Sequence, residues 1–158
     1  MTIPPQSLVR VEFLTRVVRK ESLHLISTDK RLFDDGFTLE QIEKLDATPD
    51  VAERVEAFVG RFGRLQDTLG DKLLPLLLSL LGEKVSSVID NLDRAERLGF
   101  INSTDDWMAM RNLRNQMVHE YVEDPSILHC ALLSGHDFVP LLTASADKML
   151  DEIERRMT

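Results

Sequence analysis

The 158-residue sequence contains a single cysteine, Cys130, and therefore cannot form an intramolecular disulfide bond. A lone thiol suits a reducing compartment, and we expect a cytoplasmic protein. Glycine (7 residues), proline (6 residues) and aromatic residues (6%) are sparse, and this balance favours helices over a β-sandwich. Hydrophobic residues make up 43% and charged residues 29% of the chain, a composition typical of a folded globular domain rather than a disordered one.

Long apolar runs are also missing. The first twenty residues are interrupted by four basic side chains, so we expect no secretory signal there: Arg10, Arg16, Arg19 and Lys20. The most apolar stretch, "LLPLLLSLL" at residues 73–81, is far shorter than the roughly 20 residues that a membrane helix needs. It contains Pro75, and we predict a buried core helix there and no membrane partner.

Positive charge is in short supply. Lysine and arginine number 19 against 27 aspartates and glutamates, which gives a formal net charge of −8. A broad, non-specific nucleic-acid-binding surface is normally basic, so the charge balance argues against one. We expect no DNA partner, whereas a small local basic site is compatible with the overall acidity.

What the sequence does contain is helical periodicity. Apolar residues keep helical spacing near the N-terminus and predict a helix that runs to about Phe33 and ends in a turn at Gly36: Leu8, Val11, Leu14, Val18 and Leu25. "TLEQ" at residues 38–41 is a capping box, and "TPD" at 48–50 places a proline at the first position of a further helix. Gly60 and Gly63 within that helix are interpreted as close-packing points, because no strand precedes them as a phosphate-binding loop would require.

The second half of the chain carries the same kinds of signals for helix starts and helix ends. Gly70 and Gly82 bracket the leucine-rich segment, and Gly99 is a helix stop. "STDD" at 103–106 opens a helix that "EDP" at 123–125 closes, with Asp124 capping the helix that follows. "SGHDFVP" at 134–140 predicts a break or bend before a last helix. These signals predict an all-α, up-and-down bundle of five to six helices in a single domain, residues 1–158.

The segment "RNLRNQMVHEY", residues 111–121, is unusually polar for a helix of this bundle. At 100° per residue one stripe is made of Trp107, Met110, Arg114, Met117 and Tyr121, with Val118 beside it. Arg114 thus takes a slot that packing would give to leucine or methionine. The adjacent edge of the stripe carries Arg111, Asn115 and His119. A charge on an apolar face must be paired, hydrated or used, because burying it alone is very costly.

Structural roles can account for each of these residues separately. Arg114 can form an ion pair with a carboxylate of a neighbouring helix, Asp67 or Asp93. His119 can be a border histidine with satisfied hydrogen bonds, and Tyr121 a core aromatic with a solvated hydroxyl. A metal site at His129, Cys130 and His136 is not expected, because their spacing matches no established zinc pattern. We predict neither a metal nor a cofactor.

Together the residues carry more information. "RNQMVHEY" places Arg114, four residues, His119, one residue and Tyr121 in sequence, and it resembles the R-X4-H-X-Y signature of the HEPN superfamily. The resemblance is closest to the HepT branch and its relatives, the nucleotidyltransferase substrate-binding proteins. Asn115, a polar residue directly after the arginine, fits the usual pattern. In overall organisation the resemblance covers residues 5–156, where it depends on helical layout and hydrophobic pattern.

The resemblance implies a HEPN-like helical domain and a metal-independent endoribonuclease that works as a homodimer, with one composite cleft between the motif helices. It implies catalytic roles for Arg114 and His119, which lie about 140° apart on an ideal helix and meet more easily across a two-fold axis. His119 is suited to general acid–base catalysis and Arg114 to holding phosphate oxygens. Asn115 and Arg111 are expected to support the histidine or the RNA phosphate.

By the same resemblance the protein is the toxin of a type VII toxin–antitoxin system, and its partner is a minimal nucleotidyltransferase antitoxin that transfers AMP to Tyr121. Added charge and bulk at Tyr121 would exclude RNA from the cleft. Two alternatives stay open. The chain can be a non-nuclease binding or regulatory subunit of the nucleotidyltransferase, which the net charge of −8 favours. It can also be a helical scaffold with no role on RNA.

Overall fold

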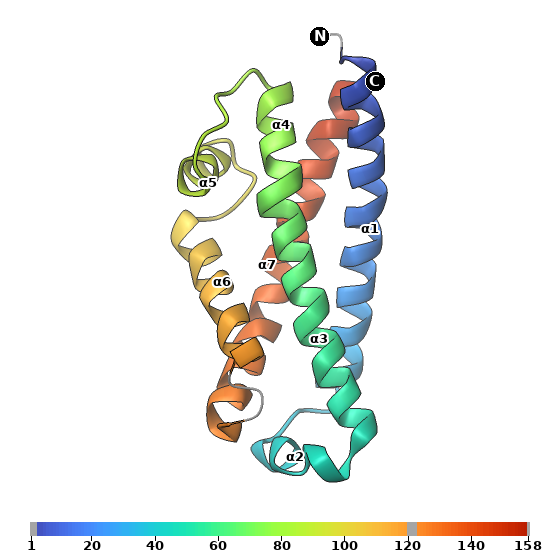
Figure 1. The fold of residues 1–158 in the computed structure, drawn as a ribbon, viewed down its shortest axis with the longest axis vertical. Coiled ribbons are helices and arrows are strands. Elements are labelled where there is room, and N and C mark those ends of the chain that lie inside the picture. Colours follow the sequence, from blue (N-terminus) through green and yellow to red (C-terminus); the bar gives the residue numbers. More distant parts are fainter. Residues whose placement is uncertain (1–2, 120–122, 158) are drawn as a thin grey trace.

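Two long helices frame the molecule, α1 (Pro5–Phe33) and α7 (Pro125–Met157). The computed structural model describes residues 3–119 and 123–157, and within these ranges the chain is all-α with no strand. Following the chain in Figure 1, α1 descends, the central rod of α3 and α4 ascends, α6 descends and α7 ascends again. The predicted up-and-down helical bundle is thereby confirmed.

The central rod is continuous through Gly70, where the sequence had suggested a boundary. Helix α3 (Pro49–Asp67) passes into a single wide π-helical turn, η2 (Thr68–Leu73), and then into α4 (Leu74–Leu80). The backbone N–H of Leu74 donates to the carbonyl of Leu69, five residues back. Pro75 follows at once, and its ring cannot donate to the carbonyl four residues back. A widened turn accommodates that defect without breaking the helix.

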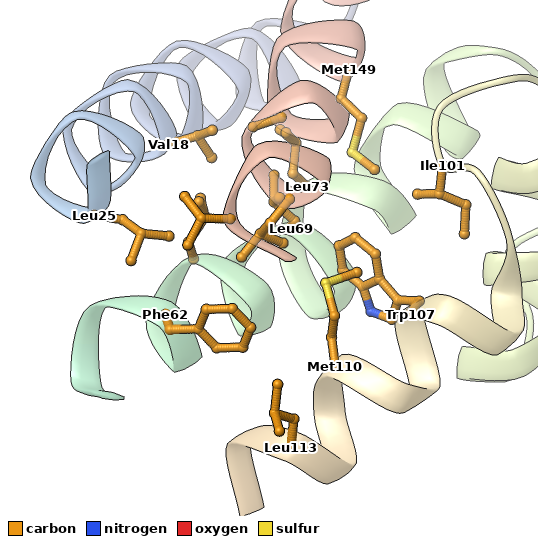
Figure 2. Packing of buried hydrophobic residues seen from close by; sticks show 14 of the residues in the cluster. Val18, Leu25, Phe62, Leu69, Leu73, Ile101, Trp107, Met110, Leu113 and Met149 are labelled. Carbon is orange, nitrogen blue, oxygen red and sulfur yellow. The ribbon is translucent and has the colours of Figure 1, made fainter. Parts of the chain in front are cut away.

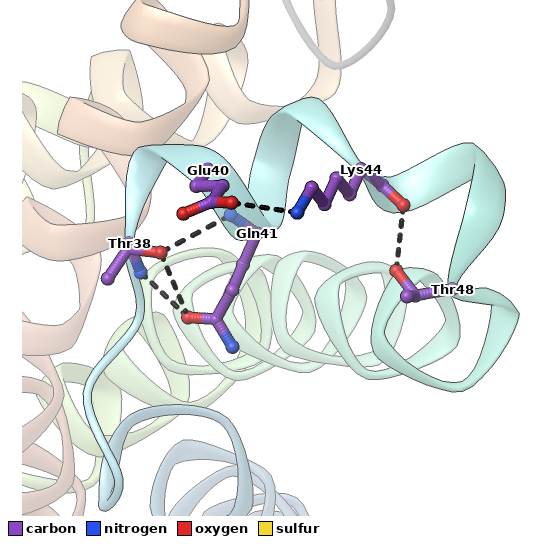
Figure 3. Close-up of polar contacts among 5 residues, drawn as sticks. All are labelled: Thr38, Glu40, Gln41, Lys44 and Thr48. Carbon is purple, nitrogen blue, oxygen red and sulfur yellow. Dashed lines mark hydrogen bonds and ion pairs between the residues drawn. The ribbon is translucent and has the colours of Figure 1, made fainter.

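The lower end of the bundle is closed by a short helix, α2 (Leu39–Glu43), and a 3-10 turn, η1 (Leu45–Ala47). Figure 3 shows the predicted capping box: the Thr38 hydroxyl accepts from the N–H of Gln41, and the Gln41 side chain accepts from the N–H of Thr38. Gly36, with φ +83°, makes the turn that precedes it. The hydroxyl of Thr48 donates to the carbonyl of Lys44 rather than capping α3.

At the other end, α5 (Val88–Arg97) lies crosswise and leads into α6 (Thr104–His119). Gly82 and Gly99 adopt the positive φ values that end α4 and α5. Asp124 caps α7 as predicted, accepting hydrogen bonds from the N–H groups of Ser126 and Ile127.

The predicted break at "SGHDFVP" is wrong. Helix α7 runs uninterrupted through Pro140, whose side chain is exposed. The buried stripe of α7 keeps its spacing of three and four residues across the proline: Leu132, Gly135, Val139, Leu142, Ala146, Met149 and Ile153. Burial of that stripe therefore outweighs the cost of a proline inside a helix, about 3 kcal/mol. Asp137 consequently lies within the helix and caps nothing.

The core lies where α1, the central rod, α6 and α7 meet. Figure 2 shows Phe62 and Leu69 of the rod, Trp107 and Met110 of α6, and Met149 of α7 above them in one buried cluster. All five side chains are buried, so α6 is anchored through its apolar face. By length and composition α7 is also apolar enough to cross a membrane, but a core helix passes the same test, and α7 packs against α1, α3 and α6 in the bundle.

Candidate functional site

Helix α6, which carries the Arg-X4-His sequence, is fixed first at its N-terminus. The hydroxyl of Ser103 accepts from the N–H of Asp106 at 2.9 Å, so the predicted cap is present. Thr104 is tied to α5, because its N–H donates to Glu96 and its hydroxyl donates to Asp93, both at 2.8 Å. These bonds set where α6 starts and hence the direction in which its later side chains point.

The buried face of α6 differs from the predicted stripe at one position. Its buried residues are Trp107, Met110, Leu113 and Met117. Leu113, not Arg114, fills the core slot between the two methionines, and Val118 is 53% exposed. Positions 113 and 114 both lie on the side of α6 that faces the rod, so helical spacing alone does not determine which of the two is buried. In the structure Leu113 packs into the core, while the guanidinium of Arg114 extends along the rod toward solvent.

Arg114 forms the ion pair with Asp67 that the structural interpretation anticipated. Its Nη1 donates to Oδ1 of Asp67 at 3.2 Å, and its Nη2 lies 3.0 Å from Oδ2. Two parallel contacts of this kind hold a guanidinium in a fixed plane. The two side chains are 35% and 37% exposed, so the pair lies at the edge of the core and in reach of solvent. Asp93, the other carboxylate considered, is engaged by Thr104 instead.

Gly63 makes room for this arrangement. A Cβ atom at Gly63 would lie 2.8 Å from Nε of Arg114, closer than real Cβ atoms approach, and 3.3 Å from its Cγ, which is a tight contact. The arginine stem therefore lies directly on the backbone of α3. The prediction that Gly63 is a close-packing point is confirmed, whereas Gly60 faces only Arg64 of its own helix.

His119 is the last residue of α6, and its side chain is exposed. Among the described residues it has no hydrogen bond or ion pair, and nothing brings it into contact with Arg114. Asn115 is exposed and Arg111 half-buried, so the polar edge of the helix does face outward as expected. Tyr121 lies outside the described residues. One copy of the chain thus presents an oriented guanidinium and an accessible imidazole on one helix without joining them.

A second carboxylate, Glu21 of α1, lies behind Asp67 and was not anticipated from the sequence. Its Oε1 accepts from the hydroxyl of Thr68, the first residue of the π turn, at 3.1 Å, while its Oε2 is buried without a partner. Burial raises the pKa of Glu21 above its ordinary value of 4.5, although the Thr68 hydrogen bond acts in the opposite direction. The nearby charge of Asp67 raises the pKa of Glu21 further.

The π turn itself abuts the site. A Cβ atom at Gly70 would lie 3.4 Å from Nε1 of Trp107, so the indole of α6 rests on the widened turn. Single π turns occur frequently at functional sites. Its sequence signals are Gly70, which was interpreted as one edge of the leucine-rich segment, and Pro75, which lies within that segment.

His129 and His136 have structural partners. Nε2 of His129 lies 2.8 Å from the carbonyl oxygen of Phe37. Nδ1 of His136 lies 2.7 Å from Oδ1 of Asp29, and its ring stacks on Phe33 at 4.4 Å between centroids. Residues 3–119 and 123–157 contain no group of three or more histidine, cysteine or acidic side chains able to hold a metal ion.

No protein-family model, curated protein or solved structure matches this chain.

Proposed function

We propose that this protein is a HepT-like endoribonuclease of the HEPN type, with Arg114 and His119 as its catalytic residues. The observation that carries the proposal is the geometry of α6. A bidentate contact to Asp67 holds the Arg114 guanidinium in a fixed orientation at the solvent edge, and His119 is accessible five residues later. Phosphate recognition and proton transfer are the two functions that metal-independent RNA cleavage requires.

The proposed reaction uses the nucleophile that RNA itself supplies. The 2′-hydroxyl attacks the adjacent phosphorus, the imidazole of His119 accepts its proton, and the imidazolium so formed donates that proton to the departing 5′-oxygen. The P–O5′ bond breaks as the P–O2′ bond forms, which leaves a 2′,3′-cyclic phosphate and a 5′-hydroxyl. Arg114 stabilises the negative charge that develops on the non-bridging oxygens. Asn115 and Arg111 extend contacts to the RNA phosphate or orient His119.

Asp67 contacts Nη1 and Nη2 of a guanidinium that carries five N–H groups, so N–H groups remain for a phosphate. The Arg114–Asp67 pair is therefore compatible with RNA binding, and it lowers the entropy cost of positioning the arginine. The carboxylate also offsets the positive charge locally, so phosphate binding at this site depends on direct contacts more than on long-range attraction.

The proposed active species is a homodimer in which the α6 helices face each other across a two-fold axis. Arg114 and His119 of one helix point about 140° apart, so the composite cleft would hold two symmetry-related sites, each pairing the arginine of one subunit with the histidine of the other. Exposed apolar side chains on α6 and in the first turn of α7 support such a seam, with Val118 53% and Ile127 41% exposed. A groove of about 290 Å³ between α6 and α7, lined in part by Leu113 and Ile127, adjoins it.

This arrangement has a quantitative consequence for mixed dimers. If Arg114→Ala and His119→Ala subunits are co-expressed with different tags, random pairing makes about half of the dimers mixed, and each mixed dimer regains one of two sites. The mixture should recover about a quarter of wild-type RNA cleavage. Recovery of none would contradict a site shared between subunits.

The proposed partner is a minimal nucleotidyltransferase antitoxin of a type VII toxin–antitoxin system that transfers AMP to Tyr121. The tyrosine is two residues beyond His119 in the sequence, so a nucleotide there would add charge and bulk near the proposed cleft. Mass spectrometry after co-expression with a co-encoded nucleotidyltransferase should find Tyr121 carrying AMP. Consistently unmodified Tyr121 would contradict this part of the proposal. The proposed location is the cytoplasm.

A specific observation favours a second function. The positive charge of Arg114 is already matched by Asp67, and the chain carries a net charge of −8. Both features suit a non-nuclease subunit that binds or regulates a nucleotidyltransferase. They oppose rapid RNA capture, although screening limits the repulsion to about 8 Å at physiological salt.

Expression in bacteria separates these functions. Wild type, Arg114→Ala and His119→Ala should be produced alone while growth and RNA integrity are followed. Growth arrest that either substitution relieves supports the toxin. Three equally harmless proteins would contradict it, and a pull-down with the co-encoded nucleotidyltransferase would then distinguish the binding subunit from a scaffold.

A further inference from the structure

An open, charged cavity lies between α1 and α3, away from α6. It has a volume of about 420 Å³ and is lined by Thr28, Arg31, Asp50, Glu53, Arg54, Ala57 and Arg61. The α3 residues recur at spacings of three and four, so they form one face of that helix, opposite Thr28 and Arg31 of α1. Small-molecule sites typically occupy roughly 300–1,000 Å³, and the cavity falls within that range.

Arg61 is held in place by neutral groups. Its Nη1 donates to the buried hydroxyl of Thr28 and, at 3.3 Å, to the carbonyl oxygen of His24. These contacts fix the direction of the guanidinium but leave its charge uncompensated. Its other N–H groups can donate hydrogen bonds to a ligand in the cavity.

The other two arginines of the cavity are unpaired within the described part of the chain. Neither Arg31 nor Arg54 makes a hydrogen bond or ion pair with another residue in the ranges 3–119 and 123–157. Asp50 and Glu53 lie on the same cavity, yet no carboxylate of the described residues lies within 4.0 Å of any of the three guanidiniums. In a chain of net charge −8, three unpaired arginines around one cavity form a localised anion-binding environment.

This cavity is separate from the Arg114 site. Arg61 and Gly63 are two positions apart on α3 and point about 160° from each other. Arg61 contacts α1, whereas Gly63 contacts Arg114 of α6. A ligand in the cavity would therefore not extend the RNA path proposed for α6.

We propose that the cavity binds a small phosphate monoester that also carries hydroxyl groups, such as a sugar phosphate. Guanidinium groups bind phosphate oxygens bidentately, which accounts for Arg31, Arg54 and Arg61. Carboxylates accept hydrogen bonds from hydroxyl groups, which accounts for Asp50 and Glu53 on the same walls. Inorganic phosphate would engage the three arginines but would leave no role for the two carboxylates, Asp50 and Glu53.

Isothermal titration of the full chain tests the proposal, with ribose 5-phosphate, inorganic phosphate and ribose as probes. Ribose 5-phosphate should bind more tightly than inorganic phosphate, and ribose should not bind. Arg54→Gln should weaken ribose 5-phosphate binding about tenfold or more, since it removes a charged hydrogen-bond donor. Lys30→Gln is the matched control, because it removes the same charge from α1 beside Arg31 without lining the cavity.

The double variant Asp50→Ala/Glu53→Ala tests the carboxylate half. Simple electrostatics predicts that it binds every anion more tightly. The proposal instead predicts that the preference for ribose 5-phosphate over inorganic phosphate falls about fivefold or more, because hydroxyl contacts are lost. Undetectable binding of ribose 5-phosphate by the wild type, equal weakening by Lys30→Gln and Arg54→Gln, or an unchanged preference in the double variant would each overturn the proposal.

Discussion

The contact between Gly63 and Arg114 can be tested by adding a single methyl group. In Gly63→Ala the new Cβ would lie 2.8 Å from Nε of Arg114, so the side chain must move away from α3. Its bidentate contact with Asp67 is then lost or weakened. The backbone at residue 63 has ordinary helical geometry, so alanine brings no strain of its own.

Two effects of comparable size oppose each other in this variant. Alanine in place of glycine inside a helix stabilises by about 0.5–1 kcal/mol. Displacing Arg114 costs up to about 1 kcal/mol, because an ion pair that is one-third exposed contributes in that range. The net change in the free energy of unfolding should therefore be close to zero. In the Arg114→Ala background the opposing cost is absent, and Gly63→Ala should stabilise by about 0.5–1 kcal/mol.

Urea denaturation of the wild type, the two single variants and the double variant measures this coupling directly. Gly60→Ala is the control, since a Cβ there meets only Arg64 of its own helix. It should stabilise equally in both backgrounds. If Gly63→Ala also stabilises the wild type and Arg114→Ala equally, the arginine does not lie on α3 and the geometry of the site is wrong.

Two further predictions concern the bundle around the site. Because burial raises the folded-state pKa of Glu21 above 4.5, its stabilising contribution is present below the unfolded-state pKa and is lost as the pH rises through the folded one. Glu21→Gln should therefore raise the free energy of unfolding at pH 7 and change it less near pH 4, and an equal effect at both would contradict the buried carboxyl. Pro140→Ala should stabilise by up to about 3 kcal/mol, since it completes the backbone hydrogen bonding of α7. A loss of thermal stability in Pro140→Ala would contradict this reasoning and would indicate that the packing of α7 requires the proline.

The helices were largely predictable because their ends carry local chemistry. The capping box at Thr38, the Ser103 cap and the Asp124 cap each depend on residues within one turn. The interior of the long helices was less predictable. Pro140 and Gly70 are local helix breakers, but the burial of stripes tens of residues long outweighs them, and that energy comes from other helices.

The candidate site was predictable in its composition but not in its geometry. The sequence indicated Arg114 as a charge that needs a partner and named Asp67 among two candidates. Spacing alone could not choose between Leu113 and Arg114 for the core, because that choice depends on the shape of α3 at Gly63. Glu21 could not be found from periodicity, since its burial follows from a π turn that lies 47 residues away in the chain.

The central claim is that α6 carries a site that cleaves RNA without metal. The most direct measurement incubates purified protein with a fluorescent RNA in EDTA and identifies the product ends. The wild type should release 2′,3′-cyclic phosphate ends, and Arg114→Ala and His119→Ala, purified in the same way, should each be slower by about a hundredfold or more. Absence of cleavage by the wild type, equal cleavage by all three proteins, or products with 3′-hydroxyl ends would contradict the claim.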